Sequence, residues 1–138
     1  KYFKEVTLCT THLVANPKYD DIKILQTYLL AKNLEKYKRV ILCGDFNDDY
    51  HPIRILQEEY GFTDVFELLD MPPPITHPVR CSSLQEVQRP DRTLDWITCS
   101  LPVNCRIAGA YAKTMRGIDA ASDHLPVIAF FEFGESKR

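Results

Sequence analysis

Apolar residues recur along the chain in short runs that predict alternating strands and helices. The unbroken run Val40-Ile41-Leu42-Cys43 is typical of a strand that is buried on both faces within an α/β sheet. The β-branched and apolar run 5–14 predicts a second strand, which ends near His12. Between these two runs, apolar residues at helical spacing predict a helix that continues to about Tyr37, namely Ile22, Leu25, Leu29, Leu30 and Leu34.

A strand, a helix and another strand in this order form a βαβ unit. Asn16-Pro17 predicts the start of the helix, and Asp20 and Asp21 follow in its first turn, where they complement the helix dipole. Because βαβ connections are right-handed and their strands are parallel, the carboxyl ends of both strands lie at the same edge of the sheet. We therefore expect His12 and Asp45 to be neighbours, although more than thirty residues separate them.

The second part of the chain adds a short helix, further strands and a long irregular segment. Residues 53–60 predict a helix that Gly61 closes, and residues 62–66 form a short apolar segment. The prolines between residues 70 and 91 exclude a helix or a central strand, and a loop of this length is usually functional or disordered. Further strands are expected at 93–99, 106–111 and 125–133, with a polar loop at 117–122.

Side chains that bind metals or move protons lie at the predicted strand ends. Asp45 and Asn47 follow the apolar strand two positions apart, so in extended backbone they point in the same direction, at the strand end where α/β sheets bind ligands. Asp95 stands between a leucine and the single tryptophan, and a carboxylate is costly to bury there unless it is paired. Asp123 and His124 precede the last strand. Each motif alone also fits an ordinary turn or a surface loop.

Composition narrows the class of protein. With 138 residues, of which 45% are hydrophobic and 26% charged, residues 1–138 are expected to form one soluble globular unit. No apolar run approaches the roughly 20 residues of a membrane span, so we expect neither a membrane partner nor a signal peptide. The formal net charge of -2 argues against a broad basic surface. Five cysteines without a CxxC pair indicate a reducing compartment, either cytoplasm or nucleus.

Taken together, the candidate residues supply carboxylates, a carboxamide and two imidazoles, without a serine or cysteine nucleophile nearby. Carboxylate oxygens bind a hard cation such as Mg²⁺, which keeps several waters and is shared with phosphate. A carboxylate can orient or deprotonate an attacking water, while imidazoles and amides stabilise the charge that builds on phosphoryl oxygens. The set therefore favours metal-assisted phosphate hydrolysis.

Four motifs resemble those of the endonuclease/exonuclease/phosphatase superfamily of Mg²⁺-dependent phosphohydrolases, in that family's order. They are Thr11-His12-Leu13, Gly44-Asp45-Phe46-Asn47, Leu94-Asp95-Trp96-Ile97 and Ser122-Asp123-His124-Leu125-Pro126-Val127.

The resemblance implies a role for each residue of these motifs that carries chemistry. Asp45 would bind or activate the attacking water, and Asn47 would hold the scissile phosphate. Asp123 would bind the metal together with Asp45 and Asn47, with Mg²⁺ as the cofactor and Mn²⁺ as the alternative. His124 would stabilise the transition state and Asp95 would orient it by a hydrogen bond. His12 would be the second imidazole on the phosphate.

Residues 10–23 and Gln26 are most similar to messenger-RNA deadenylases of the carbon-catabolite-repression type and their Angel and Nocturnin relatives. This similarity implies a 3′ exoribonuclease that acts on the 3′ end of RNA, with poly(A) as the typical substrate. Two alternatives remain open. One is a member of the superfamily that acts on DNA, a 2′,5′-linked oligonucleotide, an inositol phosphate or a sphingolipid, and the other is a non-catalytic scaffold or RNA-binding module.

The family's catalytic domain is longer than this chain, and its first half supplies an Asn and a Glu that bind the metal. Neither motif is present here. We therefore expect the C-terminal half of a four-layer α/β/β/α sandwich, with one mixed sheet that carries helices on one face and with the N-terminal half missing. The other face would pack against that N-terminal half or mediate self-association, because monomers rarely expose a large apolar face.

Overall fold

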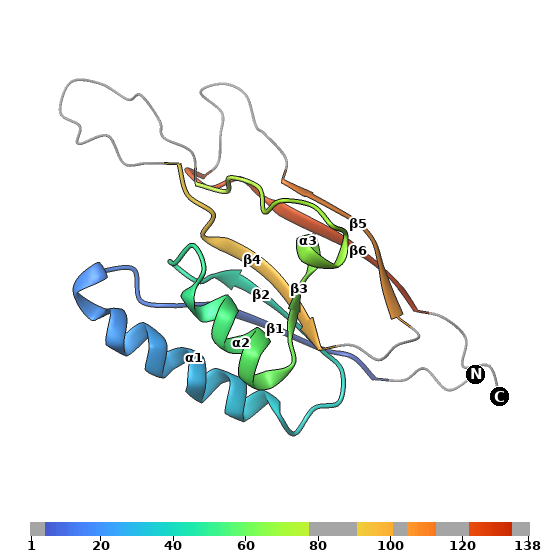
Figure 1. The fold of residues 1–138 in the computed structure, drawn as a ribbon, viewed down its shortest axis with the longest axis horizontal. Helices are drawn as coiled ribbons and strands as arrows, with labels where there is room; N and C mark the ends of the chain where they lie inside the picture. The colour runs from blue at the N-terminus through green and yellow to red at the C-terminus, as the bar shows by residue number, and fades with distance from the viewer. Residues whose placement is uncertain (1–4, 78–90, 101–104, 113–121, 134–138) are drawn as a thin grey trace.

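The computed structural model of the chain has a mixed α/β fold and describes residues 5–77, 91–100, 105–112 and 122–133 (Figure 1). Residues 78–90 of the predicted irregular segment and residues 117–121 of the predicted polar loop lie outside the described residues. The described elements are β1 (Thr7–His12), the 3-10 helix η1 (Pro17–Tyr19), α1 (Asp20–Leu34), β2 (Val40–Asp45), α2 (His51–Tyr60), β3 (Thr63–Asp64), α3 (Val65–Leu68), β4 (Asp95–Ser100), β5 (Cys105–Ala112) and β6 (Val127–Phe133).

A four-stranded mixed sheet in the order β1-β2-β4-β3 forms the centre of the fold. Strands β1 and β2 are parallel and are joined through α1, which confirms the predicted βαβ unit. Strand β4 runs antiparallel to both β2 and β3. In this register His12 pairs with Asp45, and Asp45 pairs with Asp95. Three of the predicted site residues therefore lie in one row across three neighbouring strands.

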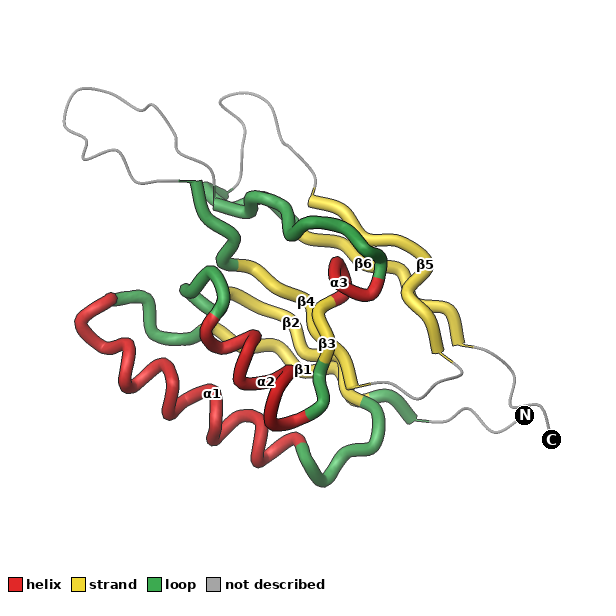
Figure 2. Tube along the Cα trace, in the orientation of Figure 1, coloured by secondary structure: helices red, strands yellow, loops and turns green. Residues whose placement is uncertain are grey.

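Helices α1 and α2 cover one face of this sheet (Figure 2). The core between them contains buried residues of the strands, of both helices and of the adjoining turns: Leu13, Ala31, Leu34, Val40, Leu42, Phe46, Ile53, Leu56, Phe62 and Trp96. Helix α2 ends at Gly61 in the left-handed conformation, as predicted. No helix in the described part of the chain is long and apolar enough to cross a membrane.

The orientation of α1 differs from what its apolar residues predict. Ile22, Leu25 and Leu29 are exposed, although their helical spacing is typical of a buried face. Lys23 and Thr27 instead lie on the buried side of the helix. Hydrogen bonds satisfy these two polar side chains on the buried side. Lys23 donates to a carboxylate of the loop after β2, and the Thr27 hydroxyl donates to the Lys23 carbonyl oxygen at 2.9 Å.

The last two strands do not join the central sheet but form an antiparallel pair, β5–β6. Their apolar residues pack with Val65 and Phe66 of α3 and with Ile41, Ile97 and Cys99, which point away from α1 and α2. The predicted mixed sheet with helices on one face is thus confirmed.

Helix α3 was not predicted, because the short apolar segment 62–66 divides at Asp64, whose side chain accepts a hydrogen bond from the Glu67 N–H and so caps the helix.

Candidate active site

The turn after β2 depends on Gly44. Its φ of +150° lies in a region that favours glycine, and a Cβ at this position would come within 1.9 Å of the Thr11 carbonyl oxygen. Asn47 then adopts the left-handed conformation with φ +50°, which asparagine tolerates. Asp45 therefore ends the strand at a place where β1 and β2 approach each other closely.

The backbone after Asp45 is a turn, so the expectation of extended backbone from Asp45 to Asn47 is wrong. The Asn47 N–H donates a hydrogen bond of 2.8 Å to Asp45 Oδ1, which forms a local turn of the kind that Asp favours. The Asn47 Nδ2 donates to the Leu13 carbonyl oxygen at 2.8 Å. Both bonds fix the carboxamide beside the ends of β1 and β2.

Two imidazoles lie near Oδ2 of Asp45. His12 Nε2 lies 3.6 Å from Asp45 Oδ2, which confirms the predicted neighbourhood of these residues. His124 Nε2 lies 3.9 Å from the same oxygen. His12 is largely exposed, whereas Asp45 and His124 are partly buried. The structure therefore brings two predicted imidazoles to one carboxylate oxygen of Asp45.

Asp95 holds the other side of the His124 ring. Its Oδ2 lies 2.7 Å from His124 Nδ1, so the predicted need of Asp95 for a partner is met. Partial burial by itself lowers the pKa of His124, but the hydrogen bond and charge of Asp95, with the charges of Asp45 and Asp123, outweigh it and raise the pKa above its usual value. His124 is thus held in orientation and favoured in its protonated form.

Buried Thr76 connects the elements that carry this pair. Its hydroxyl accepts hydrogen bonds from the N–H groups of Leu94 and Asp95, at 2.9 and 3.0 Å. Its carbonyl oxygen accepts a bond of 2.6 Å from the Leu125 N–H, next to His124. One residue of the irregular segment therefore fixes β4 to the turn before β6.

His77, the next residue, was not predicted as part of the site. Its Nε2 lies 3.7 Å from Asp123 Oδ2, and its ring packs edge-on against His124 with centroids 4.8 Å apart. Its N–H donates to the Arg92 carbonyl oxygen at 2.9 Å and its carbonyl oxygen accepts from the Arg92 N–H at 3.0 Å. No motif around residue 77 signals this position, and the only hint is that it is one of four histidines in the chain.

Two sets of possible metal-ligand side chains meet at His124. One comprises Asp45, Asp95 and His124, and the other His77, Asp123 and His124. Asp45 and Asp123 thus belong to different sets, and His124 is common to both. Asn47 Oδ1 accepts no hydrogen bond from the described residues and remains available as a third oxygen ligand. Carboxylate and carboxamide oxygens are ligands that Mg²⁺ accepts, so the chemistry of Asp45, Asn47 and Asp123 is compatible with the metal that the resemblance implies.

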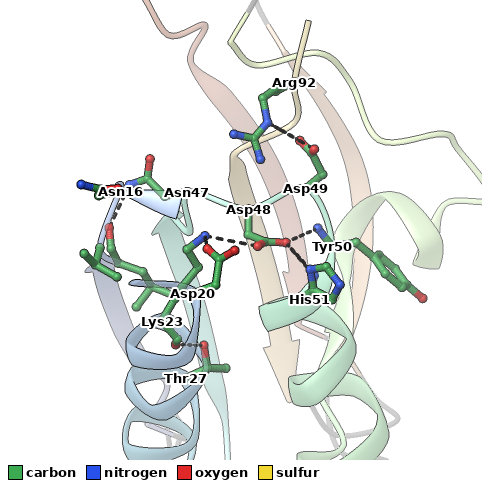
Figure 3. A network of polar contacts seen from close by, with 12 residues as sticks. Asn16, Asp20, Lys23, Thr27, Asn47, Asp48, Asp49, Tyr50, His51 and Arg92 are labelled. Atoms are coloured by element: carbon green, nitrogen blue, oxygen red, sulfur yellow. Dashed lines mark hydrogen bonds and ion pairs between the residues drawn. The ribbon is translucent and has the colours of Figure 1, made fainter. Parts of the chain in front are cut away.

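The loop that follows Asn47 is fixed by Asp48 (Figure 3). Asp48 Oδ1 accepts hydrogen bonds from the N–H groups of Tyr50 and His51, at 3.0 and 2.8 Å, and Oδ2 lies 3.3 Å from Lys23 Nζ. Burial alone raises the pKa of Asp48, but these backbone bonds and Lys23 outweigh it and leave the pKa below its usual value. The Trp96 Nε1 also donates to the Asp48 carbonyl oxygen at 3.2 Å. The turn beside the site is therefore tied to α1, α2 and β4.

The same loop is tied to the segment before β4. Arg92 Nε lies 3.2 Å from Asp49 Oδ1 (Figure 3). Because both side chains are partly or largely exposed, this pair contributes little to stability. It does connect the loop after β2 to the residue that holds His77.

Comparison with known proteins finds a relative in sequence and several solved structures that are similar in fold. No model of a known protein family matches the chain. The chain is 28% identical over 161 aligned positions to a probable CCR4-Not complex 3′-5′-exoribonuclease subunit, Ccr4, of Enterocytozoon bieneusi (strain H348). This match covers 96% of the chain and 34% of the relative, so the chain spans about a third of that protein's length.

Solved structures share the fold. One is TDP2 of D. rerio in complex with a single-stranded DNA product. The match covers 89% of the present chain and 54% of the TDP2 chain, with a TM-score of 0.71 and 17% sequence identity. Another is the human Nocturnin catalytic domain with a bound sulfate anion. This match covers 90% of the present chain and 46% of the Nocturnin chain, with a TM-score of 0.68 and 23% sequence identity. The chain therefore has part of the fold that TDP2, Nocturnin and an endonuclease/exonuclease/phosphatase family protein of Bacteroides thetaiotaomicron share, and its sequence is similar to that of the probable Ccr4 subunit.

Proposed function

We propose that the protein hydrolyses phosphodiester bonds with Mg²⁺ and shortens RNA from its 3′ end, with poly(A) as the typical substrate. The observation that carries this proposal is the row His12, Asp45 and Asp95 across three strands, with His124 held between the two carboxylates. The choice of RNA is supported by the relative from E. bieneusi, which is described as a 3′-5′-exoribonuclease subunit.

In the proposed mechanism, each residue acts according to its geometry. Asp45 would orient and deprotonate the attacking water, because its Oδ2 faces the space between two imidazoles. His124, held by Asp95 and favoured in its protonated form, would donate to a phosphoryl oxygen as negative charge builds there. His12, which is exposed at the end of β1, would contact the phosphate from the other side.

Mg²⁺ would be held by oxygen atoms of Asp45, Asn47 and Asp123 and would supply positive charge to the phosphoryl oxygens. The Glu that the family uses as principal metal ligand has no counterpart in this chain. We therefore propose that the N-terminal half of the same domain completes the site, or that a second copy packs near β1 on the sheet face opposite to α1 and α2, where β5 and β6 already cover Ile41, Ile97 and Cys99. Leu8 supports this view, because it is 72% exposed on the face of the sheet opposite to α1 and α2.

The test uses the full-length protein and a 5′-labelled RNA that ends in an oligo(A) tail. We expect Mg²⁺-dependent shortening from the 3′ end that stops at the tail, and its abolition by EDTA. Asp45→Asn should remove this activity, whereas Asp21→Asn, an exposed carboxylate on α1, serves as the matched control. Shortening that persists in Asp45→Asn would refute the assignment of the site.

A second substrate class is favoured by one comparison, because the similar TDP2 structure contains a single-stranded DNA product. A DNA strand of the same sequence as the RNA therefore belongs in the same assay. Cleavage of DNA alone would keep the metal chemistry and change the substrate. Absence of turnover on RNA, DNA, inositol phosphate and sphingolipid would favour the non-catalytic alternative.

A further inference from the structure

A second cluster of ligand side chains lies beside the proposed catalytic centre. One ligand atom from each of His77, Asp123 and His124 lies within 4.8 Å of the other two. His77 has no role in the proposed hydrolysis, although its ring contacts His124 and its Nε2 faces Asp123. This cluster differs from the Asp45 side of the site because two of its three ligand atoms are imidazole nitrogens.

One distance in the cluster is close to the ligand spacing of a tetrahedral zinc site. Zinc binds imidazole nitrogen and carboxylate oxygen at about 2.0–2.2 Å, so tetrahedral ligand atoms lie roughly 3.3–3.5 Å from one another. His77 Nε2 and Asp123 Oδ2 are already 3.7 Å apart. Imidazole ligands suit Zn²⁺, whereas Mg²⁺ prefers oxygen ligands and keeps its waters. The three ligand atoms lie within 4.8 Å of one another, so they must move closer together to bind one ion.

His124 is held in an orientation that suits a metal ligand. In metal sites, a ligating histidine usually donates its second ring N–H to a carboxylate, which fixes the ring and raises its basicity. Asp95 provides this contact to His124 Nδ1 at 2.7 Å and leaves Nε2 available. His77 has no such support, because its buried Nδ1 has no hydrogen-bond partner among the described residues. The site is therefore suited to reversible rather than structural zinc.

We propose that His77, Asp123 and His124 form an inhibitory Zn²⁺ site. This inference rests on the proposed function in one respect, namely that His124 acts on the phosphate and Asp123 serves the catalytic metal. Zn²⁺ bound at His124 Nε2 occupies the nitrogen that would donate to the phosphoryl oxygen, and it withdraws Asp123 from Mg²⁺. Zinc thus inhibits the reaction even when Mg²⁺ is in large excess.

Metal binding is tested first, without reference to activity. The full-length protein in excess Mg²⁺ is titrated with Zn²⁺ in a calorimeter and with Co²⁺ while the visible spectrum is recorded. We expect one site, with an intense tetrahedral Co²⁺ spectrum, and a loss of affinity of roughly tenfold or more in His77→Gln and in Asp123→Asn. His51→Gln is the matched control, because this exposed histidine lies on α2. Asp123 is exposed, so Asp123→Asn keeps the test decisive if His77→Gln does not fold.

Inhibition is measured next, with each variant's rate expressed relative to its own rate without zinc. We expect the Zn²⁺ concentration for half inhibition to rise roughly tenfold or more in His77→Gln and to stay unchanged in His51→Gln. Equal zinc binding in wild type, His77→Gln and Asp123→Asn would overturn the site. If the protein binds zinc through His77 but hydrolyses no substrate, the site stands and only the proposed function fails.

Discussion

Replacement of Lys23 by methionine should destabilise the protein and disturb the site, although Lys23 itself contacts no predicted catalytic residue. The Lys23 side chain is only 4% exposed, and that of its partner Asp48 is 13% exposed. In Lys23→Met, Asp48 remains as a nearly buried carboxylate without the lysine, and the exposed His51 imidazole, with Nδ1 3.2 Å from Asp48 Oδ1, stays beside it. Asp20, the second partner of Lys23, is largely exposed and loses little.

The expected loss in the free energy of unfolding follows from these contacts. Removing one partner of a fully buried ion pair costs about 3–5 kcal/mol. Asp48 keeps two backbone N–H donors, from Tyr50 and His51, so the loss should be smaller, at about 2–3 kcal/mol. Because Asp48 directly follows Asn47, the turnover number should fall as well, while binding of substrate changes less.

Urea unfolding of wild type, Lys23→Met, Asp48→Asn and the double variant measures this coupling. The double variant replaces the ion pair by an apolar side chain and an amide, so it should recover at least about 1 kcal/mol relative to the sum of the single losses. A loss below about 0.5 kcal/mol in Lys23→Met would refute the argument. Strict additivity of the two single variants would do so too, because it would mean that the pair does not interact.

Three further predictions concern single positions. In Asp95→Asn, the pKa of His124 should fall, because Asp95 contributes both a hydrogen bond and a charge that raise it. An NMR titration should show the lower pKa, and activity should be lost at a lower pH than in the wild type as the pH rises. An unchanged pKa of His124 would contradict the pairing. Burial raises the pKa of Asp64 to about 6, so the folded state binds its proton more tightly than the unfolded chain and the free energy of unfolding should fall by about 3 kcal/mol as pH rises from 4 to above 6. Asp64→Asn should remove this pH-dependent loss in urea unfolding, and an identical pH profile would count against it. Gly44→Ala should cost more than about 3 kcal/mol or prevent folding, since its Cβ would clash with the Thr11 backbone, and thermal unfolding near the wild-type temperature would disprove this.

The part of the site that the sequence predicts is the part that depends on regular structure. The neighbourhood of His12 and Asp45 follows from the parallel pairing of two strands across a helix, which is a general rule of chain geometry. The need of Asp95 for a partner follows from the cost of a buried carboxylate, and the partner is His124, as the family resemblance implies.

The residues that the sequence does not reveal depend on particular contacts. His77 lies in an irregular segment, where neither period nor motif applies, and its place is fixed by backbone bonds to Arg92 and by neighbouring Thr76. Lys23 contradicts the usual division of a helix into apolar and charged faces, because its ion pair with Asp48 turns Leu25 outward. Such tertiary contacts override the helical spacing of apolar residues.

The row formed by His12, Asp45 and Asp95 has a consequence for how the protein loses activity on heating. Hydrogen bonds between the strands fix the spacing of these three residues. Asp45 and Asp95 lie on β2 and β4, the inner strands of the sheet, which open only when the whole domain unfolds, whereas His12 ends the edge strand β1. His124 belongs instead to the turn before β6, which is held to the sheet through Thr76 and Asp95. Thermal inactivation should therefore begin with detachment of this turn, and it should be reversible until the sheet itself melts.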